Sequence, residues 1–258
     1  REVLRWIDIR LCRLYETDPR TGKTVQHDLP GSPGCAALTH DGNLLVAIGQ
    51  ELLVMSEEGG LRPVATLPGG VPGRFNDGKA DASGRLWVGT ATDEGHFDCA
   101  LWRHDPGCGF SLQLPGISMS NGIGWSPDGR RMYYVDSATR RLEVFDHDPQ
   151  TGIPGTRRTL FALPQEQLPD GLCVDAEGGI WLAVWGGGCV VHLAPDGVEL
   201  NRVALPTPLV TSCAFGGPDF RTLFITTASE DDADPYAGRL FAVEPGVAGS
   251  PPHRVRLA

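Results

Sequence analysis

The sequence repeats one pattern of short apolar runs and turn residues at intervals of about forty residues. Six runs rich in Val, Ile, Leu, Trp and Tyr can be aligned, and the spacings between their centres are 39, 42, 46, 48 and 43, counted between Trp6, Leu45, Trp87, Tyr133, Trp181 and Phe224. Such runs are typical of β-strands, and no convincing amphipathic helix separates them. A period of about forty residues made only of strands and turns is typical of propeller blades. The six copies predict an all-β, six-bladed β-propeller.

Turn sequences occur at equivalent places in the copies. Each copy continues into a second apolar strand and a polar hairpin rich in Asp, Glu, Pro and Gly, such as residues 148–152. Such residues favour tight turns because Asp and Pro suit the entry and Gly adopts positive φ. Five copies also carry a turn before the central strand, whereas in the first copy the chain begins at that strand. We therefore expect one propeller domain over residues 1–258, with a first blade that is incomplete at the N-terminus.

Polar residues recur at one position of the repeat. Eight residues before the second residue of each turn stand Gly34, Asn76, Asn121, Asp170 and Ser212. The strand before this turn is the innermost strand of a blade, so equal register predicts equal depth around one central channel. Asn and Asp also begin strands simply as turn formers, and this alternative stays open for any single position. Three such residues at one register favour a small-molecule or metal site.

The types of these residues indicate which metal they would bind. Asn and Asp supply oxygen ligands, which suit Ca²⁺, Mg²⁺ or Mn²⁺. Zn²⁺ fits less well, because none of the seven histidines falls at this register. The sequence therefore predicts one divalent ion, whose identity among Ca²⁺, Mg²⁺, Mn²⁺ and Zn²⁺ stays open.

Charge and cysteine content limit the partners and the compartment. The formal net charge is -10, which argues against nucleic acid or an anionic membrane as the main partner, since both require a basic patch. No apolar run is long enough to span a bilayer, and the first residues do not resemble a signal peptide. The seven cysteines are an odd number without a C-x-x-C pair. We expect buried, reduced thiols and a cytoplasmic protein.

Two common catalytic classes lack support in the sequence. Residues 73–79 superficially resemble a phosphate-binding loop, but Ala80 replaces the required Ser or Thr and a strand, rather than a helix, is expected to follow. The sequence has no G-x-S-x-G motif and no H-E-x-x-H motif. A serine hydrolase or a zinc protease is therefore not indicated.

Several motifs together resemble the SMP-30/gluconolactonase/regucalcin family. They include residues 74–79 (RFNDGK), 84–90 (GRLWVGT), 120–122 (SNG), 169–171 (PDG) and 215–218 (FGGP). The similarity runs in order from Leu4 to about Pro245 at the family's spacing. The resemblance implies a six-bladed propeller with a single catalytic divalent ion and a small sugar lactone as substrate.

The resemblance also implies a role for individual residues. Asn121 and Asp170 correspond to metal ligands, and Asp170 is also the general base of the family. Arg74, Asn76 and Glu94 correspond to residues that contact the substrate. In this interpretation the metal polarises the lactone carbonyl as a Lewis acid while Asp170 takes a proton from the attacking water. The chain would then be a metal-dependent lactonase, a carboxylic ester hydrolase.

One family motif is missing from the sequence. The remaining protein ligand of the family is a glutamate in a Glu-Gly-Pro-x-Trp motif on the first inner strand, and no Glu-Gly-Pro occurs here. With Asn121 and Asp170 alone, a hard cation would be held more weakly and with looser geometry. Two alternatives to the lactonase stay open: a non-catalytic calcium-binding or scaffold propeller, and a phosphotriesterase or aryl esterase that uses the same site.

Overall fold

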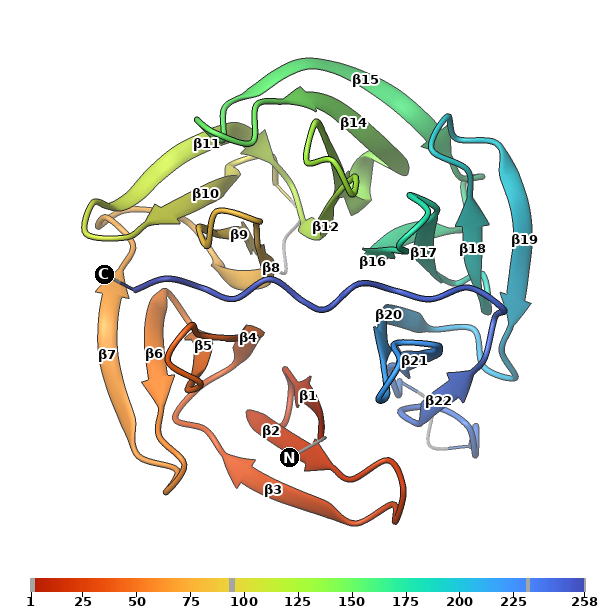
Figure 1. Cartoon of the computed structure of the whole chain (residues 1–258), viewed down its shortest axis with the longest axis horizontal. Helices are drawn as coiled ribbons and strands as arrows, with labels where there is room; N and C mark the ends of the chain where they lie inside the picture. Colours follow the sequence, from red (N-terminus) through yellow and green to blue (C-terminus); the bar gives the residue numbers. More distant parts are fainter. Residues whose placement is uncertain (1–2, 93–95, 231–232, 258) are drawn as a thin grey trace. The chain divides into compact units, whose positions relative to one another are not determined.

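The computed structural model describes residues 3–92, 96–230 and 233–257 of the chain (Figure 1). Contacts divide the chain into two compact units, one of Arg1–Ser120 with Pro252–Ala258 and the other of Asn121–Pro251. Apart from one short 3-10 helix, the regular elements of the described residues are all β-strands. This confirms the predicted all-β class.

The first unit contains three antiparallel sheets, with the strand orders β1-β2-β3, β4-β5-β6-β7 and β11-β10-β9-β8. They run from red to yellow in Figure 1. Their bounds are β1 Leu4–Asp8, β2 Arg13–Thr17, β3 Thr24–Asp28, β4 Pro33–Leu38, β5 Leu44–Ile48, β6 Glu51–Met55, β7 Leu61–Thr66, β8 Arg74–Ala80, β9 Leu86–Ala91, β10 Cys99–Asp105 and β11 Gly109–Ile117.

The second unit contains the remaining three antiparallel sheets, with the strand orders β12-β13-β14-β15, β16-β17-β18-β19 and β20-β21-β22. The 3-10 helix η1, Ser137–Thr139, follows β13. The strand bounds are β12 Ser120–Trp125, β13 Arg131–Asp136, β14 Arg141–His147, β15 Pro154–Ala162, β16 Leu168–Val174, β17 Ile180–Trp185, β18 Cys189–Leu193, β19 Glu199–Ala204, β20 Val210–Gly216, β21 Thr222–Thr227 and β22 Leu240–Val243.

The six sheets, each built from consecutive strands, are the blades of a six-bladed β-propeller, as the repeat predicts. The repeat centres lie on the second strand of their sheets at Leu45, Trp87, Tyr133, Trp181 and Phe224. In the first sheet the centre, Trp6, lies on β1 at the sheet edge, and every residue of β1 is partly exposed. The single domain over residues 1–258 stays a prediction.

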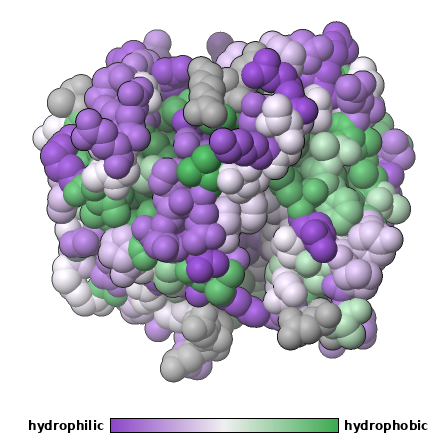
Figure 2. All heavy atoms as spheres, turned by 90° about the horizontal axis from the view of Figure 1, so that it is seen from below, coloured by the Kyte–Doolittle hydropathy of each residue, from purple (hydrophilic) through white to green (hydrophobic). Residues whose placement is uncertain are grey.

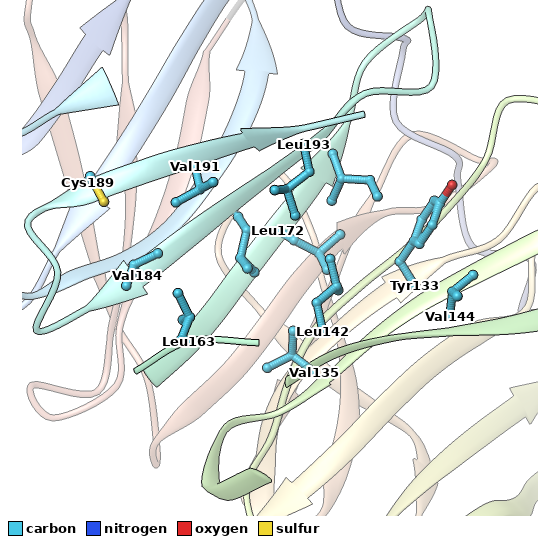
Figure 3. Close-up of a cluster of buried hydrophobic side chains, with 12 residues drawn as sticks. Tyr133, Val135, Leu142, Val144, Leu163, Leu172, Val184, Cys189, Val191 and Leu193 are labelled. Carbon is cyan, nitrogen blue, oxygen red and sulfur yellow. The ribbon is translucent and has the colours of Figure 1, made fainter. Parts of the chain in front are cut away.

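Neighbouring sheets within each unit pack through apolar side chains from their middle strands. One such cluster in the second unit joins two sheets (Figure 3). Apart from Leu163, which follows β15, its labelled members come from β13 and β14 on one side and from β16, β17 and β18 on the other, and include Tyr133, Val135, Leu142, Val144, Leu172, Val184 and Val191. β-branched and aromatic residues fit such pleated, buried faces well. Burial of these faces holds consecutive blades together.

A buried aspartate fixes the turn between the first and second strands in one sheet of each unit. In the first unit, Asp81 accepts hydrogen bonds from Arg85 Nε at 2.6 Å and Trp87 Nε1 at 2.9 Å. In the second unit, Asp175 accepts from Trp181 Nε1 at 2.9 Å, and His192 Nε2 lies 3.2 Å from the same carboxylate oxygen. Because these polar atoms are buried, each turn depends on its carboxylate.

The surface of the described residues carries mainly polar side chains. Figure 2 shows hydrophilic residues over most of the face in view, with hydrophobic residues in patches between them. Exposed large hydrophobic residues include Leu11, Phe97 and Ile153, and single exposed residues of this kind are ordinary. No helix in the described part of the chain has the length and apolar character needed to cross a membrane.

We predict that Asp81→Ala destabilises the protein by about 3 kcal/mol or more, because it leaves the guanidinium of Arg85 buried without its counter-charge. Arg85 is only 6 % exposed. Denaturant unfolding measures the change. Asp128→Ala, in the exposed turn of another sheet, is the matched control and should cost less than about 1 kcal/mol. Equal effects of the two substitutions would contradict the role given to Asp81.

A second prediction concerns His104 on β10, which is 4 % exposed and packs edge-on against Phe110. Burial lowers the pKa of His104, and the nearby charge of Asp105 opposes this only in part. The folded state therefore favours neutral imidazole, and its contribution to stability is lost as the pH falls through about 6.5, the usual pKa of an unfolded histidine. His104→Leu should weaken the fall in unfolding free energy between neutral and mildly acidic pH. An unchanged pH slope would contradict this assignment.

Candidate functional site

The residues at the predicted polar register all lie on the first strand of a sheet. In each of these sheets the first strand is an edge of the hydrogen-bonded order. The five residues, with their strands, are Gly34 on β4, Asn76 on β8, Asn121 on β12, Asp170 on β16 and Ser212 on β20. The structure therefore gives these residues equivalent positions in their own sheets.

Three of these residues stand at an irregularity in the pairing of their strand. The ladder between first and second strands shifts register between Pro33 and Cys35, between Phe75 and Gly78, and between Pro169 and Leu172. Gly34, Asn76 and Asp170 fall within these shifts. A β-bulge of this kind redirects a side chain that would otherwise follow the regular alternation. The bulges thus set the direction of the predicted site residues.

In the first unit, two of the predicted substrate-contacting residues lie together on β8. Arg74 Nη1 donates to Asn76 Oδ1 at 2.9 Å and to the Phe75 carbonyl at 3.0 Å. The amide nitrogen of Asn76 donates to the Ser120 carbonyl at 2.8 Å. Both ends of the Asn76 amide are therefore engaged, and its orientation is fixed. Glu94, the third predicted contact, lies outside the described residues.

In the second unit, a serine hydroxyl connects the two predicted metal ligands. Asn121 is 8 % exposed, and its Nδ2 donates to Ser137 Oγ at 2.7 Å. Ser137 Oγ in turn donates to the carbonyl of Pro169 at 2.6 Å, directly before Asp170. Since the amide nitrogen of Asn121 faces Ser137, its carbonyl oxygen points to the other side. Ser137 thereby orients Asn121 and holds β16 beside β12.

Close contact between β12 and β16 requires a glycine after Asn121. A Cβ at Gly122 would lie 2.6 Å from the Asp170 carbonyl oxygen and 2.8 Å from the Leu172 nitrogen. The backbone atoms of β16 could make room for this Cβ only if β12 and β16 moved apart. A Cβ at Gly171 would likewise overlap the side chain of Ser212 on β20. The glycines that follow Asn121 and Asp170 allow the first strands to pass this closely.

Burial also affects the carboxyl that follows Asn76. Burial raises the pKa of Asp77, and the charge of Lys79 and the N–H of Gly78 oppose this rise. On the neighbouring strand, burial and the charge of Asp77 raise the pKa of the Cys35 thiol. Cys35 is therefore a protonated thiol at neutral pH, and it does not have the thiolate character of a nucleophilic cysteine.

The residues available for a metal ion supply mainly oxygen. Within the described residues, no group of three or more His, Cys, Asp or Glu side chains is placed to hold a metal ion. The predicted pair of Asn121 and Asp170 is smaller than such a group, and one member is an amide. Amide and carboxylate oxygens are ligands that hard divalent cations accept, usually together with water.

The contacts of two residues next to the predicted ligands, Ser137 and Ser120, were not foreseen from the sequence. Ser137 lies at the end of the aligned run 132–137 in the sequence, but nothing in that run shows its contacts with Asn121 and Pro169. Ser120 immediately precedes Asn121, and it receives the hydrogen bond from Asn76 through its backbone, which carries no sequence signal. Both contacts join residues that are more than ten positions apart.

Comparison with known proteins identifies the group to which this chain belongs. Its six antiparallel sheets define a β-propeller, and polar residues recur on the first strands of these sheets. The profile of the SMP-30/Gluconolactonase/LRE-like region matches residues 1–229. The chain belongs to this family, as its motifs predict.

Relatives of the chain match it over nearly its whole length. It is 33 % identical over 269 residues to regucalcin of Xenopus laevis, with 97 % of this chain and 89 % of the relative covered. It is 35 % identical over 270 residues to a pentonolactonase of Haloferax volcanii, with 98 % and 91 % covered. A solved structure of a calcium-binding protein, regucalcin, from Agrobacterium tumefaciens has a TM-score of 0.93 at 31 % identity, covering 99 % of this chain and 90 % of that one.

The contact between β12 and β16 leads to a prediction for Gly122→Ala. The added Cβ must displace the backbone of Asp170, so we expect a loss of about 1–3 kcal/mol in unfolding free energy, as for other overpacked positions. Gly69→Ala is the control, because a Cβ at Gly69 meets nothing within 4 Å. Denaturant unfolding measures the unfolding free energy of both variants. Equal values would show that β12 and β16 can move apart without loss of stability, and would contradict the prediction.

Proposed function

We propose that this chain hydrolyses a sugar lactone with the help of one divalent metal ion. Membership of the SMP-30/gluconolactonase family supports the proposal, as does similarity to proteins named pentonolactonase and regucalcin. The observation that carries it is the link from Asn121 through Ser137 to the backbone before Asp170. This link orients the Asn121 amide and holds the backbone that precedes Asp170 beside it, on neighbouring first strands of one unit, which supports the assignment of the two residues as a ligand pair.

The residues fit the metal in their chemistry. Asn121 would offer its amide oxygen, since its nitrogen is directed to Ser137, and Asp170 would offer a carboxylate oxygen. This oxygen set suits Ca²⁺, Mg²⁺ or Mn²⁺ better than Zn²⁺. When bound, such an ion supplies Lewis-acid polarisation of the lactone carbonyl.

Asp170 is the proposed general base of the reaction. It lies within the bulge of β16, where its side chain is partly exposed. A carboxylate next to a cation stays ionised and can accept a proton from water. Asp170 would then be both the proton acceptor and one of the residues that hold the ion, and the attacking water would bind within hydrogen-bond reach of its carboxylate.

Arg74, Asn76 and Glu94 are the proposed substrate contacts. The bond from Arg74 Nη1 to Asn76 Oδ1 fixes the two side chains relative to each other before any substrate binds. Preorganised donors of this kind reduce the entropy lost when a polyhydroxylated ligand is oriented. Arg74 would hold ring or carbonyl oxygens, and Asn76 and Glu94 would bind sugar hydroxyls.

A cytoplasmic location is part of the proposal. All seven cysteines lie within the described residues and none forms a disulfide there. Reduced thiols in an extended β-fold fit a reducing compartment.

We predict that Asp170→Asn and Asn121→Ala each reduce lactone hydrolysis by at least about 100-fold, since Asn121→Ala removes an oxygen ligand and Asp170→Asn removes the proposed base and the negative charge of its ligand oxygen. Proton release on a panel of aldonolactones measures the rate, before and after EDTA treatment and with Ca²⁺, Mg²⁺, Mn²⁺ or Zn²⁺ added back. EDTA should abolish the activity and one of the ions should restore it. Asp196→Asn, in an exposed turn of the sheet that carries Asp170, is the control and should leave the rate unchanged.

Other outcomes would select other functions. Full turnover of Asp170→Asn at saturating metal would show that the assignment of base and ligand is wrong. Calcium binding without hydrolysis of any lactone would favour a non-catalytic calcium-binding or scaffold propeller. Faster hydrolysis of phosphotriesters or aryl esters than of lactones would favour the esterase alternative.

A further inference from the structure

The backbone of Ser137 is fixed by hydrogen bonds in which its hydroxyl takes no part. Ser137 is the first residue of η1, and its carbonyl accepts a hydrogen bond from the Arg140 N–H at 3.0 Å. One residue earlier, the Asp136 carbonyl accepts from Thr139 Oγ1 at 2.7 Å. The turn is therefore closed without the Ser137 hydroxyl, so a substitution that removes only this hydroxyl keeps these two hydrogen bonds.

The hydroxyl of Ser137 carries a single hydrogen and so can donate in only one direction. It lies 2.6 Å from the Pro169 carbonyl oxygen, which can only accept. Because the hydrogen is committed to Pro169, the hydroxyl oxygen can only accept from Asn121, whose Nδ2 lies 2.7 Å away. A side-chain amide has a donor end and an acceptor end, and only the donor end satisfies Ser137.

The same two contacts disfavour the flipped orientation of the Asn121 amide. In that orientation Oδ1 would face the Ser137 hydroxyl in place of Nδ2. The single hydrogen of Ser137 could then serve only one of two carbonyl oxygens, and the other would lie against the hydroxyl oxygen without a hydrogen between them. Ser137 is 3 % exposed and Asn121 is 8 % exposed, so water does not readily relieve this conflict. The amide oxygen of Asn121 is therefore directed away from Ser137.

We propose that Ser137 is a positioning residue for the metal site, and that its hydroxyl requires an amide rather than a carboxylate at position 121. This inference rests on the proposed metal-dependent function and adds a residue that does not itself hold the ion. A carboxylate has no hydrogen to donate to Ser137, so it would place two oxygens together in the same way as the flipped amide. Of the two proposed ligands, Asp170 then supplies the only formal negative charge.

Calorimetric titration of the metal-free protein with Ca²⁺, Mg²⁺, Mn²⁺ and Zn²⁺ tests the positioning role. Ser137→Ala removes the acceptor that selects the orientation of the Asn121 amide. The affinity for the ion that binds the native protein should fall by about 10- to 100-fold, as it does when other residues that orient metal ligands are replaced. Equal affinity in the native protein and in Ser137→Ala would overturn the proposal.

Ser126→Ala is the matched control for this titration. The Ser126 hydroxyl also makes two hydrogen bonds, donating to Asp128 Oδ1 at 2.6 Å and accepting from the Arg131 N–H at 3.0 Å. It follows β12, whereas Asn121 stands near the beginning of that strand. Ser126→Ala should therefore leave the metal affinity unchanged.

A double-mutant cycle on the metal-free protein separates orientation of the amide from simple packing. Asn and Asp have nearly the same shape, so a packing role of Ser137 predicts that Asn121→Asp lowers the denaturant midpoint equally in the native protein and in Ser137→Ala. The orientation role predicts a smaller shift in Ser137→Ala, because the hydroxyl oxygen that conflicts with the new carboxylate is gone. Repulsion between the new carboxylate and Asp170 occurs in both backgrounds and cancels. Equal shifts would overturn the proposal, even if Ser137→Ala weakens metal binding.

The two measurements separate this inference from the proposed function. A native protein that binds none of the four ions would refute the metal-dependent lactonase, and the unfolding cycle would still decide whether Ser137 requires an amide at position 121. Native metal binding and lactone hydrolysis that both persist unchanged in Ser137→Ala would overturn the positioning role alone.

Discussion

In both units, neighbouring first strands approach so closely that a side chain between them would overlap backbone. Gly34 faces Phe75 and Asn76 in the first unit, where a Cβ would lie 2.7 Å from the Asn76 nitrogen. Gly122 faces Asp170 in the second. Asn76 and Asp170 are thus each positioned partly by a glycine on the strand beside them. The glycines do not themselves bind a ligand, but a larger residue would move the polar side chains that do.

Much of this arrangement could be predicted from sequence because it repeats. The apolar period located the second strands, the turns located their starts, and a fixed count from the turns located Asn76, Asn121 and Asp170 on first strands. The directions of the side chains were harder to predict from the sequence than the positions of the strands. Bulges at Asn76 and Asp170 interrupt the alternation on which sequence-based assignment of faces depends. The hydrogen bonds through the Ser137 hydroxyl could not be predicted from the sequence at all. Ser137 and Pro169 are distant in sequence, and Pro169 contributes only its backbone carbonyl.

The contacts of the C-terminal segment, residues 244–257, could not be predicted from the sequence either. After β22 the sequence has no repeated strand pattern, yet it binds turns in both units. In the second unit Gly249 N donates to the Phe220 carbonyl at 2.8 Å, and in the first unit His40 N donates to the Val255 carbonyl at 3.0 Å. These turns end the first strands, whereas the register residues stand near their beginnings. The segment therefore contacts the turns after β4 and β20, at the strand ends that lie away from the register residues.

The turn from Ser137 to Arg140 gives its first and last residues different surroundings. Its first residue is buried and joins two strands through its hydroxyl, while its last residue is partly exposed and places a charge at the surface. The hydrogen bond from the Arg140 N–H to the Ser137 carbonyl closes the single 3-10 turn between these two residues. A change at position 140 that keeps the left-handed backbone leaves both hydrogen bonds of the Ser137 hydroxyl in place. By contrast, a change at Ser137 acts on the proposed ligand pair directly, since its hydroxyl is both the acceptor for Asn121 and the donor to Pro169.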